Sequence, residues 1–144
     1  MAVRYVDFKL EDGAKRPYKK HTGDAGWDLF VNRGCDIAPG ETADVHTGVH
    51  IEMPPYLYAR ITGRSSSLRK HHLLINEGII DNGYTGELFV CVHNMGSETF
   101  HVEPGMRLAQ VLFHTIEDVR WSEVEDIRPT PGKRGDNGFG STGV

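Results

Sequence analysis

One carboxylate stands where a strand is predicted to end and a tight turn to begin. Residues 78–86 read Gly-Ile-Ile-Asp-Asn-Gly-Tyr-Thr-Gly. Asp81 follows two β-branched residues and precedes the pair Asn82-Gly83, which is typical of two-residue hairpin turns. A carboxylate held rigidly beside such a turn can act as a general base. An aspartate that only forms the turn is the simpler alternative, because aspartate is common in turns.

A second group of residues offers hydrogen-bond donors. Residues 63–67 read Gly-Arg-Ser-Ser-Ser and combine a guanidinium, hydroxyls and successive backbone N–H groups, which are the donors that a phosphate chain needs. An ordinary helix cap with a solvated arginine explains the same residues. Gln110 shares a predicted apolar strand face with Leu108 and Leu112, and a polar side chain on such a face requires a partner.

Two carboxylates suggest a metal contact. Asp24 and Asp28 flank Trp27, and Asp28 could contact the hydration shell of Mg²⁺, which keeps several waters when phosphates supply other ligands. A surface turn around a core tryptophan explains the segment equally well. The eight histidines form no HExxH motif, and no Walker A motif is present. The sequence therefore supports neither a zinc protease nor a Walker-type nucleotide site.

The elements that must position these residues are predicted to be short strands. Apolar and polar residues alternate with the period of two that is typical of half-buried strands. This pattern covers residues 45–53, 57–62, 87–93 and 107–114. Turn residues separate these runs, among them many of the 17 glycines and 7 prolines, so we predict an all-β sandwich or barrel. One short helix is predicted near residues 66–72, with a serine as its cap.

Length and composition restrict the class of protein. The chain has 144 residues, which favours one compact domain. The longest apolar run, residues 88–92, is far shorter than the ~20 residues of a spanning helix. The first residues lack an apolar stretch of signal-peptide length, so we expect a cytoplasmic protein without membrane contact. The net charge of -4 disfavours direct nucleic-acid binding. Cys35 and Cys91 have no CxxC partners, which argues against a disulfide framework.

The composition changes near the C-terminus. Residues 129–144 are rich in glycine and contain one aromatic side chain, so composition alone predicts a flexible tail. We therefore expect a folded domain over residues 1–128, followed by a flexible glycine-rich segment over residues 129–144.

Five segments, taken in order, resemble the five motifs of the trimeric deoxyuridine triphosphate nucleotidohydrolases, or dUTPases. They are residues 25–28, 63–66, 78–86, 105–110 and 134–143. The resemblance implies a distorted β jelly-roll barrel that forms a homotrimer with exchanged C-terminal tails. Each active site would be assembled from all three chains. It also implies Mg²⁺-assisted hydrolysis of dUTP to dUMP and pyrophosphate, which limits uracil in DNA and supplies dUMP for dTMP synthesis.

The resemblance implies a role for each candidate residue. Asp81 would activate the water that attacks the α-phosphorus, and Asp28 would meet Mg²⁺ through water. Tyr84 would pack against the deoxyribose and leave no room for a ribose 2′-hydroxyl. The residues that would hold the α- and β-phosphates are Arg64, Ser65, Ser66 and Gln110.

The same resemblance assigns residues to the base and to the tail. Uracil would be read by main-chain groups between Ile79 and Phe89, including Ile80, with Asn76 near the base. The tail would close over the substrate as a lid, with Phe139 stacked on uracil. The tail residues that would clasp the γ-phosphate are Arg134, Gly140, Ser141 and Thr142.

Two alternatives remain open. A dCTP deaminase has a similar fold and a similar segment over residues 63–68, but its chemistry needs a glutamate base, for which Glu77 or Glu87 would have to serve. Release of ammonia from dCTP or of pyrophosphate from dUTP separates the two enzymes. The other alternative is a jelly-roll protein that binds a nucleotide to regulate a partner and does not turn it over.

Overall fold

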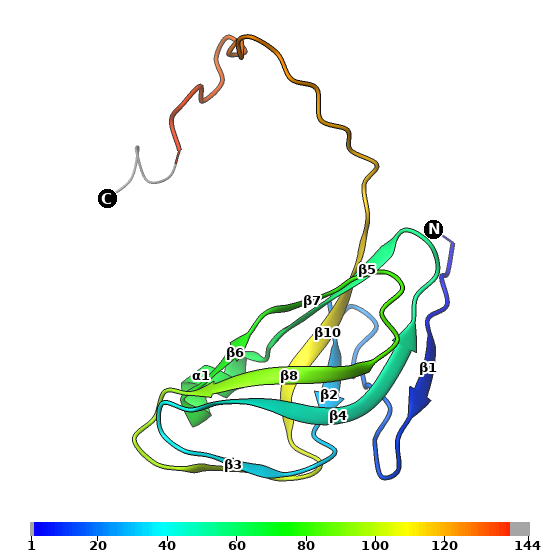
Figure 1. The fold of residues 1–144 in the computed structure, drawn as a ribbon, viewed down its shortest axis with the longest axis vertical. Helices are drawn as coiled ribbons and strands as arrows, with labels where there is room; N and C mark the ends of the chain where they lie inside the picture. Colours follow the sequence, from blue (N-terminus) through cyan, green and yellow to red (C-terminus); the bar gives the residue numbers. More distant parts are fainter. Residues whose placement is uncertain (1, 139–144) are drawn as a thin grey trace.

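Two four-stranded sheets form the body of the fold in this computed structural model, which describes residues 2–138. The first sheet has the strand order β1-β4-β8-β6, and the second has the order β2-β10-β5-β7. Neighbouring strands run antiparallel. Figure 1 shows β4 and β8 in front of β2 and β10, with α1 at one end of the barrel. This architecture confirms the predicted all-β class and a jelly-roll type of barrel.

The elements have the following bounds. The first sheet contains β1 (Asp7–Leu10), β4 (Thr42–Glu52), β6 (Leu73–Asn76) and β8 (Glu87–Asn94). The second contains β2 (Trp27–Phe30), β5 (Leu57–Gly63), β7 (Gly78–Ile80) and β10 (Arg107–Thr115). A two-stranded ribbon pairs β3 (Cys35–Ile37) with β9 (Phe100–Val102). The helix α1 covers Ser65–His71.

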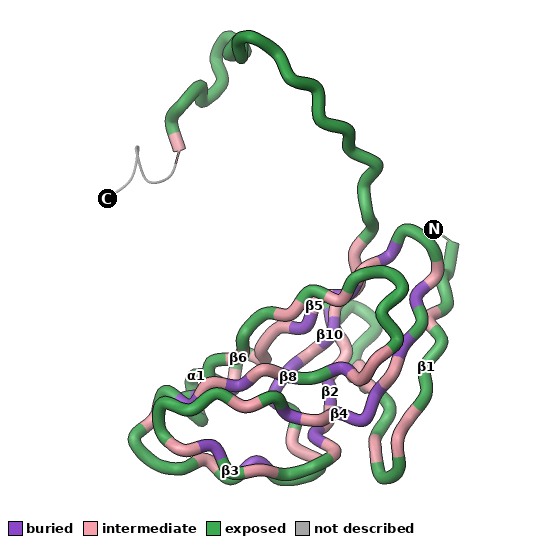
Figure 2. The backbone as a smooth tube through the Cα atoms, viewed as in Figure 1, coloured by how far each residue is buried: buried purple, intermediate pink, exposed green. Residues whose placement is uncertain are grey.

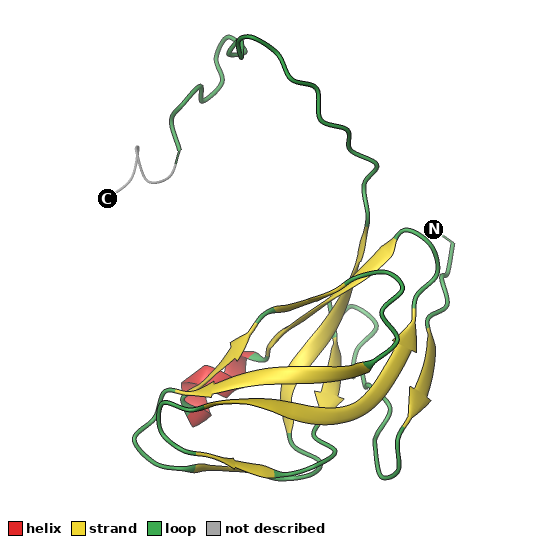
Figure 3. Cartoon of the chain, in the orientation of Figure 1, coloured by secondary structure: helices red, strands yellow, loops and turns green. Residues whose placement is uncertain are grey.

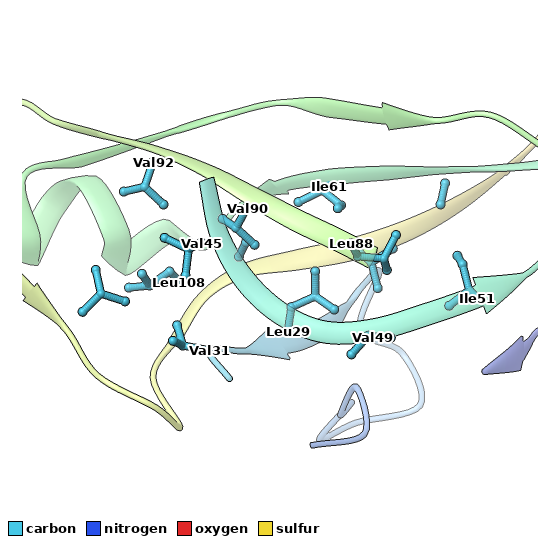
Figure 4. Packing of buried hydrophobic residues seen from close by; sticks show 14 of the residues in the cluster. Leu29, Val31, Val45, Val49, Ile51, Ile61, Leu88, Val90, Val92 and Leu108 are labelled. Carbon is cyan, nitrogen blue, oxygen red and sulfur yellow. The ribbon is translucent and has the colours of Figure 1, made fainter. Parts of the chain in front are cut away.

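The core lies between the sheets and is built from alternate residues of their strands. Figure 4 shows β4 contributing Val45, Val49 and Ile51 to a cluster that also contains Leu29 and Ile61. None of these five side chains is more than 6% exposed. Full burial of one such side chain stabilises the fold by about 1.5–3 kcal/mol. The core therefore provides a rigid frame for the connections that carry the candidate site residues.

A bulge in β4 interrupts the alternation predicted for residues 45–53. The register of β4 on β8 shifts around Gly48, and residues 47–49 are all buried. Gly48 has a φ of 68°, and a Cβ atom there would lie 2.7 Å from side-chain atoms of Ala14 and Asn32. Because another residue would clash, glycine is required at this position.

The short helix forms where the sequence predicts it, but its cap differs. The N-cap residue is Arg64, and its side chain makes no capping hydrogen bond, so the predicted serine cap is wrong. Ser67 is instead buried within the helix, and its hydroxyl donates to the Leu108 carbonyl over 2.6 Å. This bond fixes the start of α1 against β10.

The Asn82-Gly83 connection is a turn, but it does not close a two-residue hairpin. β7 pairs with β5, whereas β8 pairs with β4 and β6, so the flanking strands belong to different sheets. The Tyr84 N–H donates to the Asp81 carbonyl over 3.1 Å, and Gly83 has a φ of 97° while Asn82 is outside the left-handed region. A two-residue type I′ hairpin needs positive φ at both central residues. Positive φ at the second central residue alone is typical of a type II turn.

The chain leaves the barrel after Thr115. Between there and residue 138 the described chain contains neither strand nor helix, and Figure 3 shows it extending away from the sheets. Figure 2 shows that this segment, which we call the C-terminal arm (residues 116–138), is almost wholly exposed. The division into a domain over residues 1–128 and a tail stays a prediction. Within residues 2–138 no helix has the length and apolar character needed to span a membrane.

Candidate functional site

A basic cleft of about 450 Å³ opens where β2, β10 and the start of α1 meet. Both oxygens of the half-buried Asp28 carboxylate are engaged there: Oδ1 lies 3.0 Å from Arg64 Nε, and Oδ2 lies 3.2 Å from Arg107 Nη1. Four lysine and arginine side chains and two aspartates line the cleft, so it is positive in an acidic protein. The lining residues are Tyr18, Lys19, Lys20, His21, Asp24, Ala25, Gly26, Asp28, Arg64, Arg107 and Gln110.

The strand register brings the polar groups of the basic cleft together. Asp28 on β2 is the direct partner of Gln110 on β10. The apolar face predicted for Gln110 is wrong, because a bulge between Arg107 and Ala109 puts Ala109 and Val111 on the core face of β10. The half-buried Gln110 lies on the other face, where its Nε2 donates to the Gly63 carbonyl over 3.3 Å. A Cβ atom on Gly26 would lie 2.8 Å from Gln110 Oε1 and 3.1 Å from the Val111 carbonyl oxygen. Glycine at position 26 therefore allows the glutamine side chain to occupy this site.

The two predicted phosphate-binding serines lie beside the basic cleft. Ser65 is exposed and Ser66 is half-buried, and both belong to the first turn of α1, directly after Arg64. Arg64 Nη1 also donates to the Arg107 carbonyl over 2.9 Å. Sequence reasoning did not assign Arg107 to the site. The sequence pointed to Arg107 only through its place in the segment of residues 105–110. Its ion pair with Asp28 could not be predicted, because it depends on the pairing of strands that are 79 residues apart.

The 81–84 turn, residues Asp81 to Tyr84, carries the predicted base on an exposed surface. The Tyr84 hydroxyl donates to the Glu87 carbonyl over 2.8 Å. A Cβ atom on Gly86 would lie 2.5 Å from that hydroxyl oxygen, so the phenol ring lies across a position that only glycine leaves open. This packing fixes the Tyr84 ring relative to the backbone that follows the turn.

The residues predicted to read the base flank the 81–84 turn. Ile79 is 56% exposed and Phe89 is 40% exposed. β7, which contains Ile79 and Ile80, is the last strand of its sheet, so in the described chain one edge of it is unpaired. An unpaired edge offers backbone donors and acceptors to a ligand. Asn76 lies at the end of β6, opposite Cys91 of β8.

A polar network supports the 81–84 turn from behind. Partial burial raises the pKa of Glu87, but hydrogen bonds from His46 and from the Gly48 N–H, at 3.0 Å and 3.1 Å, outweigh this and lower the pKa overall. His50 places Nδ1 2.9 Å from the Thr85 carbonyl oxygen and Nε2 2.8 Å from a Glu11 carboxylate oxygen. The bond to the Thr85 carbonyl, followed by the bond to Glu11, raises the pKa of His50.

The basic cleft and the 81–84 turn lie at opposite ends of the barrel. Figure 1 shows α1, which borders the basic cleft, at one end, and the connection from β7 to β8 at the other. The structure therefore does not bring Asp81 and Tyr84 together with Arg64 and Gln110 in one chain. Arg134 lies in the exposed C-terminal arm. The remaining predicted residues, Phe139, Gly140, Ser141 and Thr142, lie outside the described residues.

The basic cleft, which is the candidate place for a metal, already contains the ion pairs of Asp28. Across residues 2–138 no three histidine, cysteine or acidic side chains converge as metal ligands. Asp28 offers hard carboxylate oxygens, but both are paired with guanidinium groups. This arrangement fits Mg²⁺ held mainly by phosphates, with Asp28 reached through water.

The barrel, the positive cleft and the tyrosine-bearing turn belong to a class of nucleotide-processing proteins: the chain is a member of the dUTPase family, whose model matches residues 12–143. Its relatives include the deoxyuridine 5'-triphosphate nucleotidohydrolase of Clostridium novyi, which is 40% identical over 138 residues, 94% of this chain and 96% of that protein. The protein of the same name from Crocosphaera subtropica is 41% identical, with coverage of 94% and 96%.

Solved structures show the same fold. The dUTPase of Staphylococcus bacteriophage 80alpha, solved with dUPNHPP, has a TM-score of 0.89 and 28% identity, covering 99% of this chain and 100% of that one. A mutant dUTPase from phage phi11 of S. aureus, described with a structural Mg(II) ion, has a TM-score of 0.81 and 25% identity, covering 87% and 99%.

Proposed function

We infer that this chain hydrolyses dUTP to dUMP and pyrophosphate. The observation that carries this conclusion is the match over residues 12–143 to a family whose relatives at about 40% identity are named for dUTP hydrolysis. The two regions described above have the chemistry that the two halves of this substrate require. The basic cleft suits a triphosphate, and the exposed apolar surface beside the 81–84 turn suits a nucleoside.

In the proposed mechanism, water attacks the α-phosphorus and its proton passes to Asp81. A bond forms between the α-phosphorus and the water oxygen. The bond between the α-phosphorus and the oxygen that bridges it to the β-phosphorus breaks, and pyrophosphate leaves with the electrons of that bond. Arg64 and Arg107, which pair with Asp28, are proposed to neutralise negative charge on the bound phosphates. Mg²⁺ bound to the phosphates would supply further neutralisation, with Asp28 contacting it through water.

Selectivity for the deoxynucleotide is proposed to depend on Tyr84. Its ring lies across Gly86 and its hydroxyl is tied to the Glu87 carbonyl, so it is a fixed wall against which a deoxyribose would pack. A 2′-hydroxyl would then meet the ring without a hydrogen-bond partner. The unpaired edge at Ile79 and Ile80 would read uracil through backbone groups.

We further propose that the active sites form in a homotrimer. The predicted base and the predicted phosphate ligands lie at opposite ends of one chain (Figure 1), so one site needs the 81–84 turn of one copy and the basic cleft of another. The C-terminal arm supports association, because four of its apolar side chains are 55–99% exposed and would be covered in an assembly. They are Val119, Trp121, Val124 and Ile127.

The arm also has a candidate docking place on another copy. A groove of about 470 Å³ is lined by apolar residues, among them Phe8, Trp27 and Phe113, and by Arg4 and Arg16. These cations suit a segment that is rich in acidic residues, as the C-terminal arm is. Arg134 of the arm and residues 139–142, which follow the arm, are proposed to close over the substrate of a neighbouring chain.

The deaminase alternative is disfavoured by the positions of its two candidate glutamates. Glu77 forms an ion pair with Arg60 over 2.7 Å, and Glu87 is held by His46 and the Gly48 N–H. Both carboxylates are already engaged with other groups, which disfavours either one as the base of a deaminase. The direct test incubates the protein with dUTP, dCTP, dTTP or UTP, with and without Mg²⁺. Pyrophosphate from dUTP supports the proposal, and ammonia from dCTP would contradict it.

We further propose that the protein is located in the cytoplasm and that dUTP is the ligand that it binds there.

A complementation experiment tests whether sites are shared between copies. At dUTP concentrations well below the wild-type KM, chains carrying Asp81→Asn and chains carrying Arg64→Ala are each expected to have little activity alone. After mixing with subunit exchange, about a quarter of the sites should combine an intact turn from one chain with an intact cleft from another, and activity should return. A mixture that stays as inactive as its components would overturn the shared-site proposal. The shared-site proposal would also be overturned if the active protein sediments as a monomer under assay conditions.

A further inference from the structure

The side chain of Asn82 is not used by its own turn. The turn is closed by the backbone bond from Tyr84 to Asp81, and a type II turn makes no demand for asparagine at its first central position. Asn82 Nδ2 instead donates to the Pro54 carbonyl over 2.8 Å and to the Leu57 carbonyl over 2.9 Å. An amide nitrogen carries two hydrogens, so both donors are used on a distant segment.

The segment that receives these bonds is stiff. The β4–β5 loop, which we define as Pro54 to Leu57 so that it includes the first residue of β5, begins with two prolines, whose φ angles are fixed. Tyr56 lies in the left-handed region with a φ of 66°, and its carbonyl accepts from the Ile116 N–H over 2.9 Å. The Pro55 carbonyl accepts from the Arg4 guanidinium. Each carbonyl of the loop is therefore engaged, so the loop is a fixed anchor.

The turn needs such an anchor because of its place in the topology. β7 and β8 belong to different sheets, so no ladder of cross-strand bonds holds the turn as it would in a hairpin. On the Tyr84 side, the bonds to the Glu87 carbonyl and from His50 fix the chain. On the Asp81 side, the two bonds of Asn82 tie the turn to the barrel.

We propose that Asn82 is a positioning residue for dUTP hydrolysis, because it holds the backbone that aims the Asp81 carboxylate at the attacking water. This inference rests on the proposed function, in which Asp81 is the base. A base must lie within hydrogen-bond distance of the proton that it takes. A displacement of about 1 Å can reduce a rate by about 10²-fold.

The test compares Asn82→Asp and Asn82→Ala with the wild-type protein. Asn82→Asp keeps the shape but places a carboxylate against two carbonyl oxygens, so we expect kcat to fall by about 10- to 100-fold. KM and the dissociation constant of dUpNHpp should stay within about three-fold, with full binding stoichiometry. Asn82→Ala should give a smaller loss of kcat. Ser97→Asp, which adds the same charge in an exposed connection between β8 and β9, is the control and should match the wild type.

Several outcomes would overturn the proposal. Wild-type kcat in both Asn82 variants would show that the tether is dispensable, and a loss of rate that matches a loss of binding stoichiometry would show a role in folding only. If the wild-type protein does not hydrolyse dUTP, the proposed function fails. The tether is then still tested by hydrogen exchange at the Tyr84 N–H, which should quicken in Asn82→Ala, and unchanged exchange would refute it.

Discussion

The basic cleft and the 81–84 turn are positioned in different ways. The basic cleft is built from strands in register, and Asp28 lies between two guanidinium groups on a frame that the core supports. The 81–84 turn is exposed, joins strands of different sheets, and is tied by side chains to backbone carbonyls. Charge neutralisation weakens gradually with distance, whereas proton transfer needs contact. The region that needs contact is therefore the one with dedicated tethers.

The largest effect is expected at the turn. Asp81→Asn keeps the shape of the side chain but removes the base, so kcat should fall by about 10³-fold. The dissociation constant of dUTP should change by no more than about three-fold, because the basic cleft is untouched. Single-turnover kinetics and calorimetry measure the two quantities. Undiminished turnover in this variant would show that another group takes the proton.

A change in the basic cleft should mainly raise KM, whereas Asp81→Asn should mainly lower kcat. Arg107→Met removes one cation that is paired with Asp28, so we expect KM for dUTP to rise by about ten-fold while kcat falls by less than three-fold. Arg69→Met removes the same charge from the exposed face of α1, outside the cleft lining, and serves as the control. Steady-state kinetics measure KM and kcat for both variants. Equal effects from the two variants would mean that overall charge, and not the cleft, sets affinity.

The smallest effect concerns pH and the network behind the turn. The pKa of His50 is raised in the folded protein, so protonated His50 contributes stability that is complete below its ordinary pKa and lost as the pH rises through the raised value. The charged groups that face it are Lys9 on β1, Glu11 after β1, and Glu87 on β8.

His50→Gln should therefore lower the free energy of unfolding by about 0.5 kcal/mol at low pH, as is typical of an exposed ion pair. The difference from the wild type should vanish at alkaline pH. Urea titrations at about pH 6 and about pH 9 measure it. A difference that is equal at both values would show that the charge of His50 plays no part.

The sequence predicted the strands better than the contacts between them. Alternation in β8 follows directly from burial on one face, and the helix follows from local propensity. In β10 a bulge after Arg107 interrupts the alternation, so that Leu108 and Ala109 are both buried. The partner of Asp28 could not be predicted, because Arg107 lies 79 residues away and meets it only through the pairing of β2 with β10. The Asn82-Gly83 pair predicted a turn correctly and a hairpin wrongly, since the sheet that each flanking strand joins is decided by tertiary packing.

The loop of residues 54–57 has a consequence for how the chain can vary. Exposed loops in most proteins accept insertions and deletions. Here a change of even one residue in length would shift both acceptors of Asn82 and also the carbonyl that meets the first N–H of the C-terminal arm. Among the surface connections of the described barrel, this one is therefore expected to keep a fixed length while its exposed side chains vary.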